Sequence, residues 1–281
     1  MSDALILSDD LSHLRPILPL IFSYFTLKIY HSSKYQPMLK PLEYLYIIVA
    51  VVEIFAEATQ NEVVKFFSKP LLMILLLAFY VQAIDRNWNK LHKFMAASFV
   101  FAWFGDVALM FVPKSFEDTT IMGLHKNPNF FLVGLAAFLV AHMLYAIAFG
   151  HVSNKTKTPL LPRKFWIAIP LVIYMVTLLY YLAPAINNSA LTKPFLGPVI
   201  IYSMAIATMV AFALNRYGRV NDKSFALVFG GALLFMFSDS IIAVNKFLYP
   251  FESAGIFIMA LYIAGQYLIA KGALQQFKKD N

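Results

Sequence analysis

The chain has 281 residues, of which 60% are hydrophobic and only 14% are charged, whereas a typical soluble domain is about a quarter charged. Its mean hydropathy is +0.68, so the polar residues are too few to cover a soluble core, and the composition indicates a multi-pass membrane protein. The chain has no cysteine, which excludes disulfides, thiolate nucleophiles and cysteine-bound zinc. Its net charge of +8 fits basic membrane loops, so no nucleic-acid partner is expected.

Residues 1–41 are expected to form an N-terminal extension. The first residues, MSDALILSDDLSHLRP, carry acids where a cleavable signal peptide has its basic region, so no such signal is predicted. The stretch 16–30, PILPLIFSYFTLKIY, is hydrophobic but short, and it contains two prolines and Lys28. It is therefore a possible extra membrane segment, which either spans the bilayer or lies at its surface.

Eight hydrophobic segments then predict an all-α bundle of eight transmembrane helices over residues 42–274, with a cytoplasmic tail at 275–281. Most segments reach or approach the ~20 residues that cross a bilayer. The segments are 42–58, 69–84, 93–112, 128–149, 164–184, 194–214, 225–245 and 254–274. Helix starts are predicted at or near Pro70, Pro128, Pro194 and Ser224.

Lysine and arginine divide the loops into two sets. If the region before Pro41 is cytoplasmic, most of the basic residues fall in the loops on that side, including 85–93, 150–164 and 215–223. Basic loops stay in the cytoplasm, so the C-terminus is predicted to be cytoplasmic as well. The host membrane is expected to be a bacterial inner membrane or the endoplasmic reticulum, depending on the source.

A few ionisable residues lie inside these segments: Glu53, Glu57, Asp106, His142 and Asp239. A charge near the bilayer centre costs at least ~2.5 kcal/mol, so each is a candidate functional residue. Asp106 and Asp239 each lie ~6 Å beyond the midpoint of an outward-running helix, at 1.5 Å per residue. Glu53 falls at nearly the same level and Lys69 begins the next helix at that outer end, which predicts a shared polar chamber.

Structural roles remain open for all of these residues. His142 and Tyr145 lie one turn apart, as do Tyr262 and Gln266, and such polar pairs often hold helices together. Only His142 among the histidines is well inside a segment, whereas a helical zinc site needs about three ligands. No metal or other cofactor is therefore expected. The sequence also has no serine elbow, no phosphate-binding glycine loop and no mid-helix lysine for a Schiff base.

Five stretches together resemble the lysoplasmalogenase-like family of multi-pass membrane proteins. They are SKPLLMILLL (68–77), FAWFGDVALMF (101–111), FFLVGLAAFLVAHMLYAIAF (130–149), GGALLFMFSDSIIAVNKF (230–247) and LYIAGQYLIAKG (261–272). The residues that fit the family's pattern are Lys69–Pro70, Gly105–Asp106, Gly134–Leu135, His142, Tyr145, Ser238–Asp239, Tyr262 and Gln266. The resemblance covers residues 42–274, and the segment 16–30 lies outside it.

The resemblance implies an intramembrane hydrolase that cleaves the vinyl-ether bond of lysoplasmalogens to a fatty aldehyde and a glycerophospho-base. Asp106 and Asp239 are then the expected catalytic carboxyl groups, since burial favours the neutral acid and unlike surroundings divide two carboxyls between acid and charge stabiliser. Lys69 is expected to meet the substrate phosphate. The other expected substrate-binding residues are Glu53, His142, Tyr145, Tyr262 and Gln266.

Two other functions remain open. Buried carboxyls also serve as proton relays, so a proton-coupled transporter of lipids or small solutes is the alternative, although the sequence has no internal repeat and no matching pair of broken helices. A scaffold whose acids only pack helices is the third. The expected partners are a lysophospholipid that arrives from the bilayer and the surrounding membrane lipids, and the oligomeric state is left open.

Overall fold

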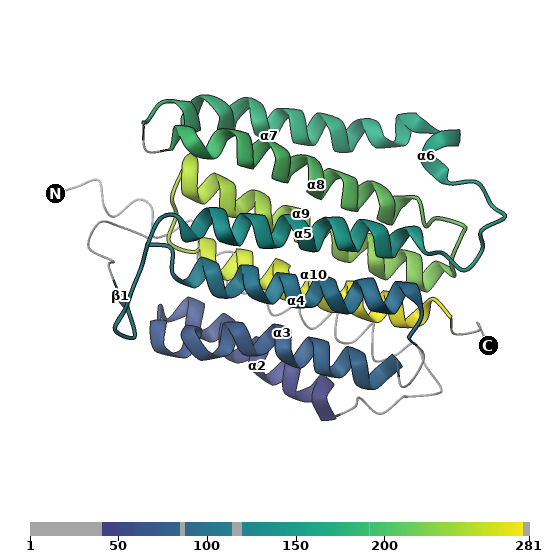
Figure 1. The fold of residues 1–281 in the computed structure, drawn as a ribbon, viewed down its shortest axis with the longest axis horizontal. Coiled ribbons are helices and arrows are strands. Elements are labelled where there is room, and N and C mark those ends of the chain that lie inside the picture. Colours follow the sequence, from purple (N-terminus) through teal and green to yellow (C-terminus); the bar gives the residue numbers. More distant parts are fainter. Residues whose placement is uncertain (1–40, 85–87, 114–119, 191, 278–281) are drawn as a thin grey trace, which may run out of the picture. The chain divides into compact units, whose positions relative to one another are not determined.

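The computed structural model describes residues 41–84, 88–113, 120–190 and 192–277, and nearly all of them are helical (Figure 1). The long helices are α2 (Pro41–Ala58), α3 (Glu62–Ile84), α4 (Lys90–Met110), α5 (Phe130–Gly150), α7 (Ile169–Asn187), α8 (Leu196–Leu214), α9 (Asp222–Phe247) and α10 (Ala254–Gln275). The short elements are α6 (Leu160–Arg163), the 3-10 turns η1 (Phe165–Ala168) and η2 (Lys193–Phe195), and the hairpin strands β1 (Thr120–Ile121) and β2 (Leu124–His125). The predicted helical bundle is confirmed.

Within the described ranges, seven helices are long and apolar enough to cross a membrane: Glu62–Ile84, Lys90–Met110, Phe130–Gly150, Phe165–Asn187, Lys193–Leu214, Asp222–Phe247 and Ala254–Gln275. The chain is therefore an integral multi-pass membrane protein. The predicted segment 42–58 is also a helix, α2, but it carries Glu43, Glu53 and Glu57 and is not among the seven. The possible segment 16–30 lies outside the described residues.

The helices α3, α4 and α9 begin earlier than the predicted segments 69–84, 93–112 and 225–245. The helix α3 begins at Glu62 rather than near Pro70, because the side chain of Asn61 caps its first turn by accepting a hydrogen bond from a backbone N–H at 3.1 Å. The helix α9 begins before Ser224, where Asn221 Oδ1 accepts the Ser224 N–H at 2.7 Å. The first turns of α3 and α9 contain charged residues, so hydropathy predicts that these helices begin later than they do.

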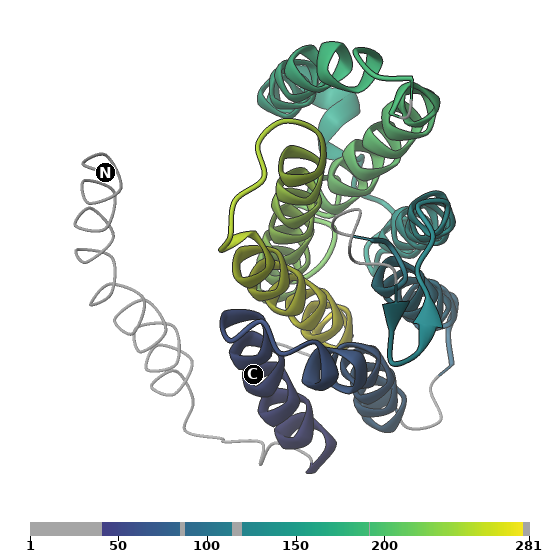
Figure 2. The ribbon, with the colours of Figure 1, turned by 90° about the vertical axis from the view of Figure 1, so that its left-hand side faces the viewer.

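Most of the helices lie side by side, with α4 against α5, α5 against α8, and α9 against α10 (Figures 1 and 2). The pair α2 and α3 packs on α10. The helix α7 contacts α8 and α9 at the edge of the bundle, and only 11% of its apolar stretch is buried, against 39–44% in the other six spans. Most of α7 is therefore exposed on the side of the bundle.

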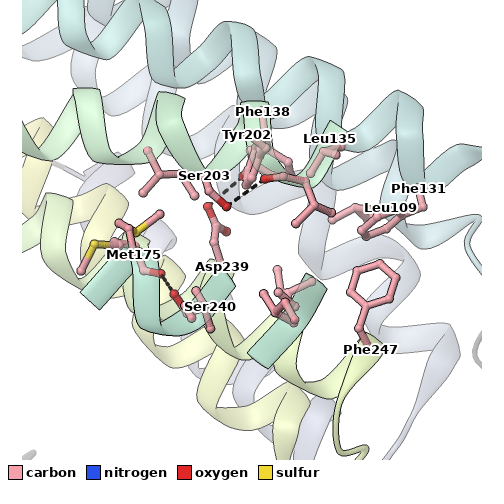
Figure 3. A pocket seen from close by; sticks show the side chains of 17 residues that line it. Leu109, Phe131, Leu135, Phe138, Met175, Tyr202, Ser203, Asp239, Ser240 and Phe247 are labelled. Atoms are coloured by element: carbon pink, nitrogen blue, oxygen red, sulfur yellow. Dashed lines mark hydrogen bonds between the residues drawn. The ribbon is translucent and has the colours of Figure 1, made fainter. Parts of the chain in front are cut away.

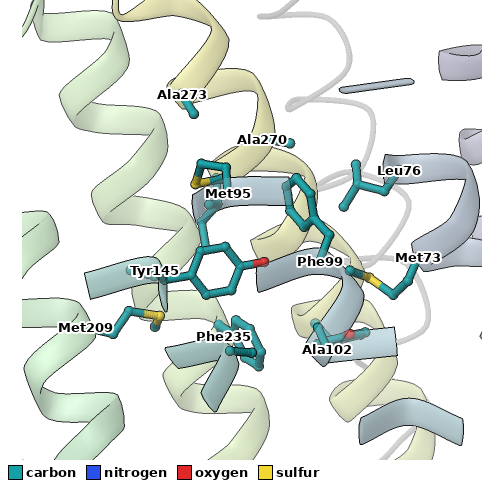
Figure 4. Close-up of a cluster of buried hydrophobic side chains, with 14 of the residues drawn as sticks. Met73, Leu76, Met95, Phe99, Ala102, Tyr145, Met209, Phe235, Ala270 and Ala273 are labelled. Carbon is teal, nitrogen blue, oxygen red and sulfur yellow. The ribbon is translucent and has the colours of Figure 1, made fainter. Parts of the chain in front are cut away.

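The bundle core consists of interlocking aromatic and methionine side chains, among them Met95, Phe99, Tyr145 and Phe235 (Figure 4). Next to it, α9 and α10 approach through glycines. A Cβ at Gly231 would lie 2.6 Å from the carbonyl oxygen of Gly265, so only glycine permits this spacing. The close contact brings polar residues of α9 and α10 to the centre of the bundle.

Candidate active site

Both aspartates that the sequence places inside the membrane are buried in the helix bundle. Asp106 on α4 is 3% exposed and Asp239 on α9 is 9% exposed. The Tyr262 hydroxyl on α10 donates a hydrogen bond to Asp106 Oδ2 at 2.6 Å, and the Tyr202 hydroxyl on α8 donates one to Asp239 Oδ2 at 2.8 Å. Each carboxyl group is thus held by a tyrosine from another helix.

His142 on α5 is the second neighbour of Asp239. Its Nδ1 lies 2.6 Å from the carbonyl oxygen of Phe138, which only accepts, so Nδ1 carries a proton and donates it. Its Nε2 lies 3.5 Å from Asp239 Oδ2 and makes no hydrogen bond with the described residues. The imidazole is thereby oriented with its second nitrogen toward the carboxyl, where it can take up or release a proton.

Tyr145 and Gln266 form a third buried contact between helices. The Tyr145 hydroxyl on α5 donates to Gln266 Oε1 on α10 at 2.5 Å. Tyr262 lies one turn before Gln266 on the same helix face, where it contacts Asp106. These three predicted residues therefore meet on the Asp106 side of the bundle, and His142 meets Asp239 instead.

Two phenylalanines lie between the aspartate clusters. The Phe235 ring centroid is 4.7 Å from that of His142 and 5.3 Å from that of Tyr262. The Phe138 ring lies 6.1 Å from both Phe235 and Tyr262. The two acids therefore lie on opposite sides of a layer of aromatic rings. They are still close enough for a charge on Asp106 to act electrostatically on Asp239.

Glu53 and Lys69 belong to the Asp106 side. Glu53 is fully buried, and the Ser68 hydroxyl donates a hydrogen bond to its Oε2. The positive charge of Lys69 is near enough to influence both Glu53 and Asp106. These residues come from α2, α3 and α4. The predicted chamber shared with Asp239 is not seen, because the cavity is lined by Asp239 and not by Asp106, Glu53 or Lys69.

Lys65, which the sequence analysis did not single out, forms the ion pairs at this end of the bundle. Its Nζ lies 3.0 Å from Glu57 Oε2 and 3.2 Å from Glu62 Oε1. Lys65 lies one turn before Lys69 on α3 and is buried, whereas Lys69 is half-buried. Lys65 precedes the predicted span 69–84, so its sequence position is that of an ordinary surface lysine.

A cavity opens on Asp239 (Figure 3). Its volume is about 50 Å³, enough for a few water molecules. Tyr202, Ser203, Asp239 and Ser240 supply the polar part of its wall, and apolar side chains from α4, α5, α7, α8 and α9 supply the rest. Asp106 is not among the residues that line it.

Tyr202 is the main residue of this site that the sequence analysis missed. It stands in the apolar run VIIYSMAI, where a tyrosine and a serine interrupt the centre of a span. That interruption is a usable signal, since buried tyrosine hydroxyls usually find a partner. The sequence does not reveal its partner, Asp239, because that residue lies on another helix.

Arg216 is a second buried charge that hydropathy does not reveal, and it lies between α8 and α9, outside the spans. It is fully buried, its Nη2 donates to Ser224 Oγ at 2.9 Å, and its guanidinium carbon lies 5.7 Å from the centroid of the Phe149 ring. Burial lowers the pKa of the Arg216 guanidinium to about 10. The residue is therefore still a cation at neutral pH, and it ties α8 to α9.

Across the described parts of the chain, no group of three or more His, Asp or Glu side chains is arranged to hold a metal ion. The ionisable side chains of the site are carboxyl, imidazole and phenol groups. Long apolar helices around a cavity with a buried carboxyl define a multi-pass membrane protein with a polar intramembrane site.

Residues 64–273 match the YhhN family, and the chain belongs to this family. It is similar to lysoplasmalogenase TMEM86B of Sus scrofa, with 36% identity over 152 residues, or 54% of this chain and 57% of that protein. Lysoplasmalogenase TMEM86A of Bos taurus is 32% identical over 153 residues, or 53% of this chain and 58% of that protein. The predicted family relationship is confirmed.

The chain spans a little over half the length of the curated relatives that it matches. Lysoplasmalogenase TMEM86B of Homo sapiens is 33% identical over 148 residues, or 53% of this chain and 56% of that protein. No solved structure matches this chain.

Proposed function

We propose that this protein hydrolyses the vinyl-ether bond of a lysoplasmalogen, releasing a fatty aldehyde and a glycerophospho-base. The similarity to proteins named lysoplasmalogenases supports the substrate class. The observation that carries the mechanism is the cavity inside the apolar bundle that opens on Asp239 (Figure 3). A lipid substrate reaches such a site from the bilayer rather than from water.

The reaction begins when a carboxylic acid transfers its proton to the β-carbon of the vinyl ether. The double-bond electrons form the new C–H bond, and an oxocarbenium ion remains at the carbon bound to oxygen. Water adds to that carbon and gives its proton back to the carboxylate. The resulting hemiacetal collapses to the aldehyde and the glycerol hydroxyl, so the net reaction consumes one water and regenerates the acid.

Asp239 is the proton donor in this proposal, because it is the carboxyl that lines the cavity. Tyr202 holds one of its oxygens, and His142 Nε2 faces the same oxygen at 3.5 Å. The two contacts orient the carboxyl, and the water that adds to the substrate returns the proton to it. Asp106 supplies negative charge that stabilises the oxocarbenium ion, the second role of a carboxylate pair.

The other predicted substrate-binding residues have supporting roles around Asp106 in this proposal. Tyr262 holds Asp106 in position, the Tyr145–Gln266 hydrogen bond ties α5 to α10 beside it, and Glu53 and Lys69 set the charge around it. We place the C-terminus and the basic loops in the cytoplasm, as the distribution of lysine and arginine indicates. The active site then lies toward the opposite side of the membrane.

The proposal is tested by measuring aldehyde release from purified protein given a lysoplasmenyl phospholipid. The saturated alkyl-ether analogue is the control, since it has no double bond to protonate and should remain intact. We expect aldehyde only from the vinyl ether. Protein that is folded but releases no aldehyde, and that instead moves lipid across vesicle membranes in response to a pH gradient, would favour the transporter.

A further inference from the structure

Lys246, at the end of α9, lies beside the cavity that holds Asp239. Its Nζ is 4.6 Å from the ring centroid of Phe131 on α5 and 6.0 Å from that of Phe247. Both rings line the cavity (Figure 3). The faces of aromatic rings attract an ammonium group at such distances, so the charge is held at the cavity rim.

No acidic side chain among the described residues forms an ion pair with Lys246. Two carboxylates near the ends of the bundle pair with other lysines, Glu57 with Lys65 at 3.0 Å and Glu43 with Lys271 at 2.6 Å. Lys246 is also exposed at the surface. Its charge is therefore available to an anion that enters the cavity rim.

The spacing along α9 fits one kind of anion. Lys246 follows Asp239 by seven residues, which places it on the same helix face about 10 Å further along the axis. In a lysoplasmalogen, six covalent bonds separate the vinyl carbon on oxygen from the phosphorus, a reach of about 8 Å when extended. A vinyl ether held at Asp239 therefore brings its phosphate to the ammonium group.

An apolar groove continues the cavity on the lipid side. It lies between α7 and α9, with Ile173, Thr177 and Tyr181 on one wall and Val244 and Leu248 on the other. Leu178 lines both the groove and the cavity. The groove suits a hydrocarbon chain, and Leu178 stands where that chain would pass from lipid to Asp239.

We propose that Lys246 binds the phosphate of a single-chain phospholipid whose vinyl ether lies at Asp239 and whose chain lies in the groove between α7 and α9. This inference rests on the proposed function and assigns its phosphate contact to Lys246 rather than to Lys69.

The test compares Lys246→Met with wild-type protein on a lysoplasmenyl phospholipid and on an alkenylglycerol that has no phosphate. We expect Lys246→Met to raise KM for the phospholipid about tenfold, the loss of one charge-assisted contact, with little change in kcat. The KM for alkenylglycerol should not change, and Lys246→Arg should restore most of the affinity. Lys193→Met is the matched control, because Lys193 is an exposed lysine on η2, the turn whose Phe195 ring packs on Phe131 and Phe247.

Equal KM changes for both substrates, an equal effect of Lys193→Met, or a phosphate-dependent effect of Lys69→Met in place of Lys246→Met would each overturn the assignment. Binding of the uncleavable alkyl-ether lysophospholipid provides a readout that needs no catalysis. Wild-type protein should bind it more tightly than Lys246→Met does. If the wild type binds this lipid through Lys246 but cleaves no vinyl ether, the phosphate site stands and the proposed hydrolysis fails.

Discussion

Asp106 and Asp239 are the same residue type in similarly apolar stretches, yet their surroundings differ. Asp239 opens on a cavity and faces His142, whereas Asp106 accepts from Tyr262 and lies near the charges of Glu53 and Lys69. Unlike surroundings are what allow two carboxyl groups to perform different tasks in one reaction. We therefore assign the proton transfer to Asp239 and the charge stabilisation to Asp106.

Asp239→Asn and Asp106→Asn should separate catalysis from structure. Both changes are near-isosteric, so each variant should still fold, and Asp239→Asn should lower kcat at least about a hundredfold, the lower range for a general acid. The double variant should be little slower than Asp239→Asn, because groups that act together are not additive. A purely structural role predicts the reverse, a lower melting temperature with near-normal specific activity of the folded protein.

The sequence singles out candidate site residues but does not reveal their partners. Asp106, Asp239 and His142 stand out because ionisable groups are costly in apolar spans. Their pairing depends on how each helix is rotated about its axis, which one sequence does not reveal. The contact of Tyr202 with Asp239 and the aromatic layer of Phe235 therefore emerge only from the packed bundle.

At the scale of helices, the close approach of α9 and α10 positions the site. Gly231 and Gly265 face each other there, whereas a Cβ at the adjacent Gly230 would meet nothing within 4 Å. Gly230 and Gly231 are therefore suited to a direct comparison, because only Gly231 lies at the contact between α9 and α10.

Gly231→Ala should destabilise the protein and Gly230→Ala should not. A methyl group at Gly231 would press on the backbone of α10, and overpacking of this kind costs about 1–3 kcal/mol. Alanine at Gly230 has open space and a better helix propensity. Thermal unfolding in detergent should show a lower midpoint for Gly231→Ala only, and equal midpoints would show that the two helices do not pack through this glycine.

Hydropathy predicts where the spans lie, because a bilayer needs long apolar helices. It misplaces the starts of α3 and α9, where the caps Asn61 and Asn221 lie in polar sequence. The β1–β2 hairpin was not predicted either. Its turn residues Met122 and Gly123 both have positive φ, 49° and 78°, as a two-residue hairpin requires, but methionine is an uncommon choice for that conformation.

At the scale of the whole molecule, the orientation in the membrane decides from which side the lipid is recognised. The loops between α5 and α6 and between α8 and α9 are basic and lie at the C-terminal end of the bundle (Figure 1). Lys246 and the β1–β2 hairpin lie at the other end. With the basic loops in the cytoplasm, as we propose, the lipid phosphate lies at the non-cytoplasmic surface.

Single cysteines test this orientation without background, since the chain has none of its own. Thr158 and Ser253 are exposed loop residues at opposite ends of the bundle. We expect Ser253→Cys to react with an impermeant thiol reagent added to intact cells, and Thr158→Cys to react only after the membrane is opened. The reverse pattern would invert the orientation and place the site toward the cytoplasm.

The central claim is that a carboxylic acid protonates a carbon atom of the lipid, and hydrolysis in D₂O tests it most directly. The aldehyde, trapped at once by reduction to the alcohol, should carry one deuterium on the carbon next to the former carbonyl. Mass spectrometry of the alcohol measures this deuterium. Its presence at that carbon in the product of the wild-type protein supports the proposed proton transfer, and an aldehyde formed at the normal rate without it would contradict the mechanism.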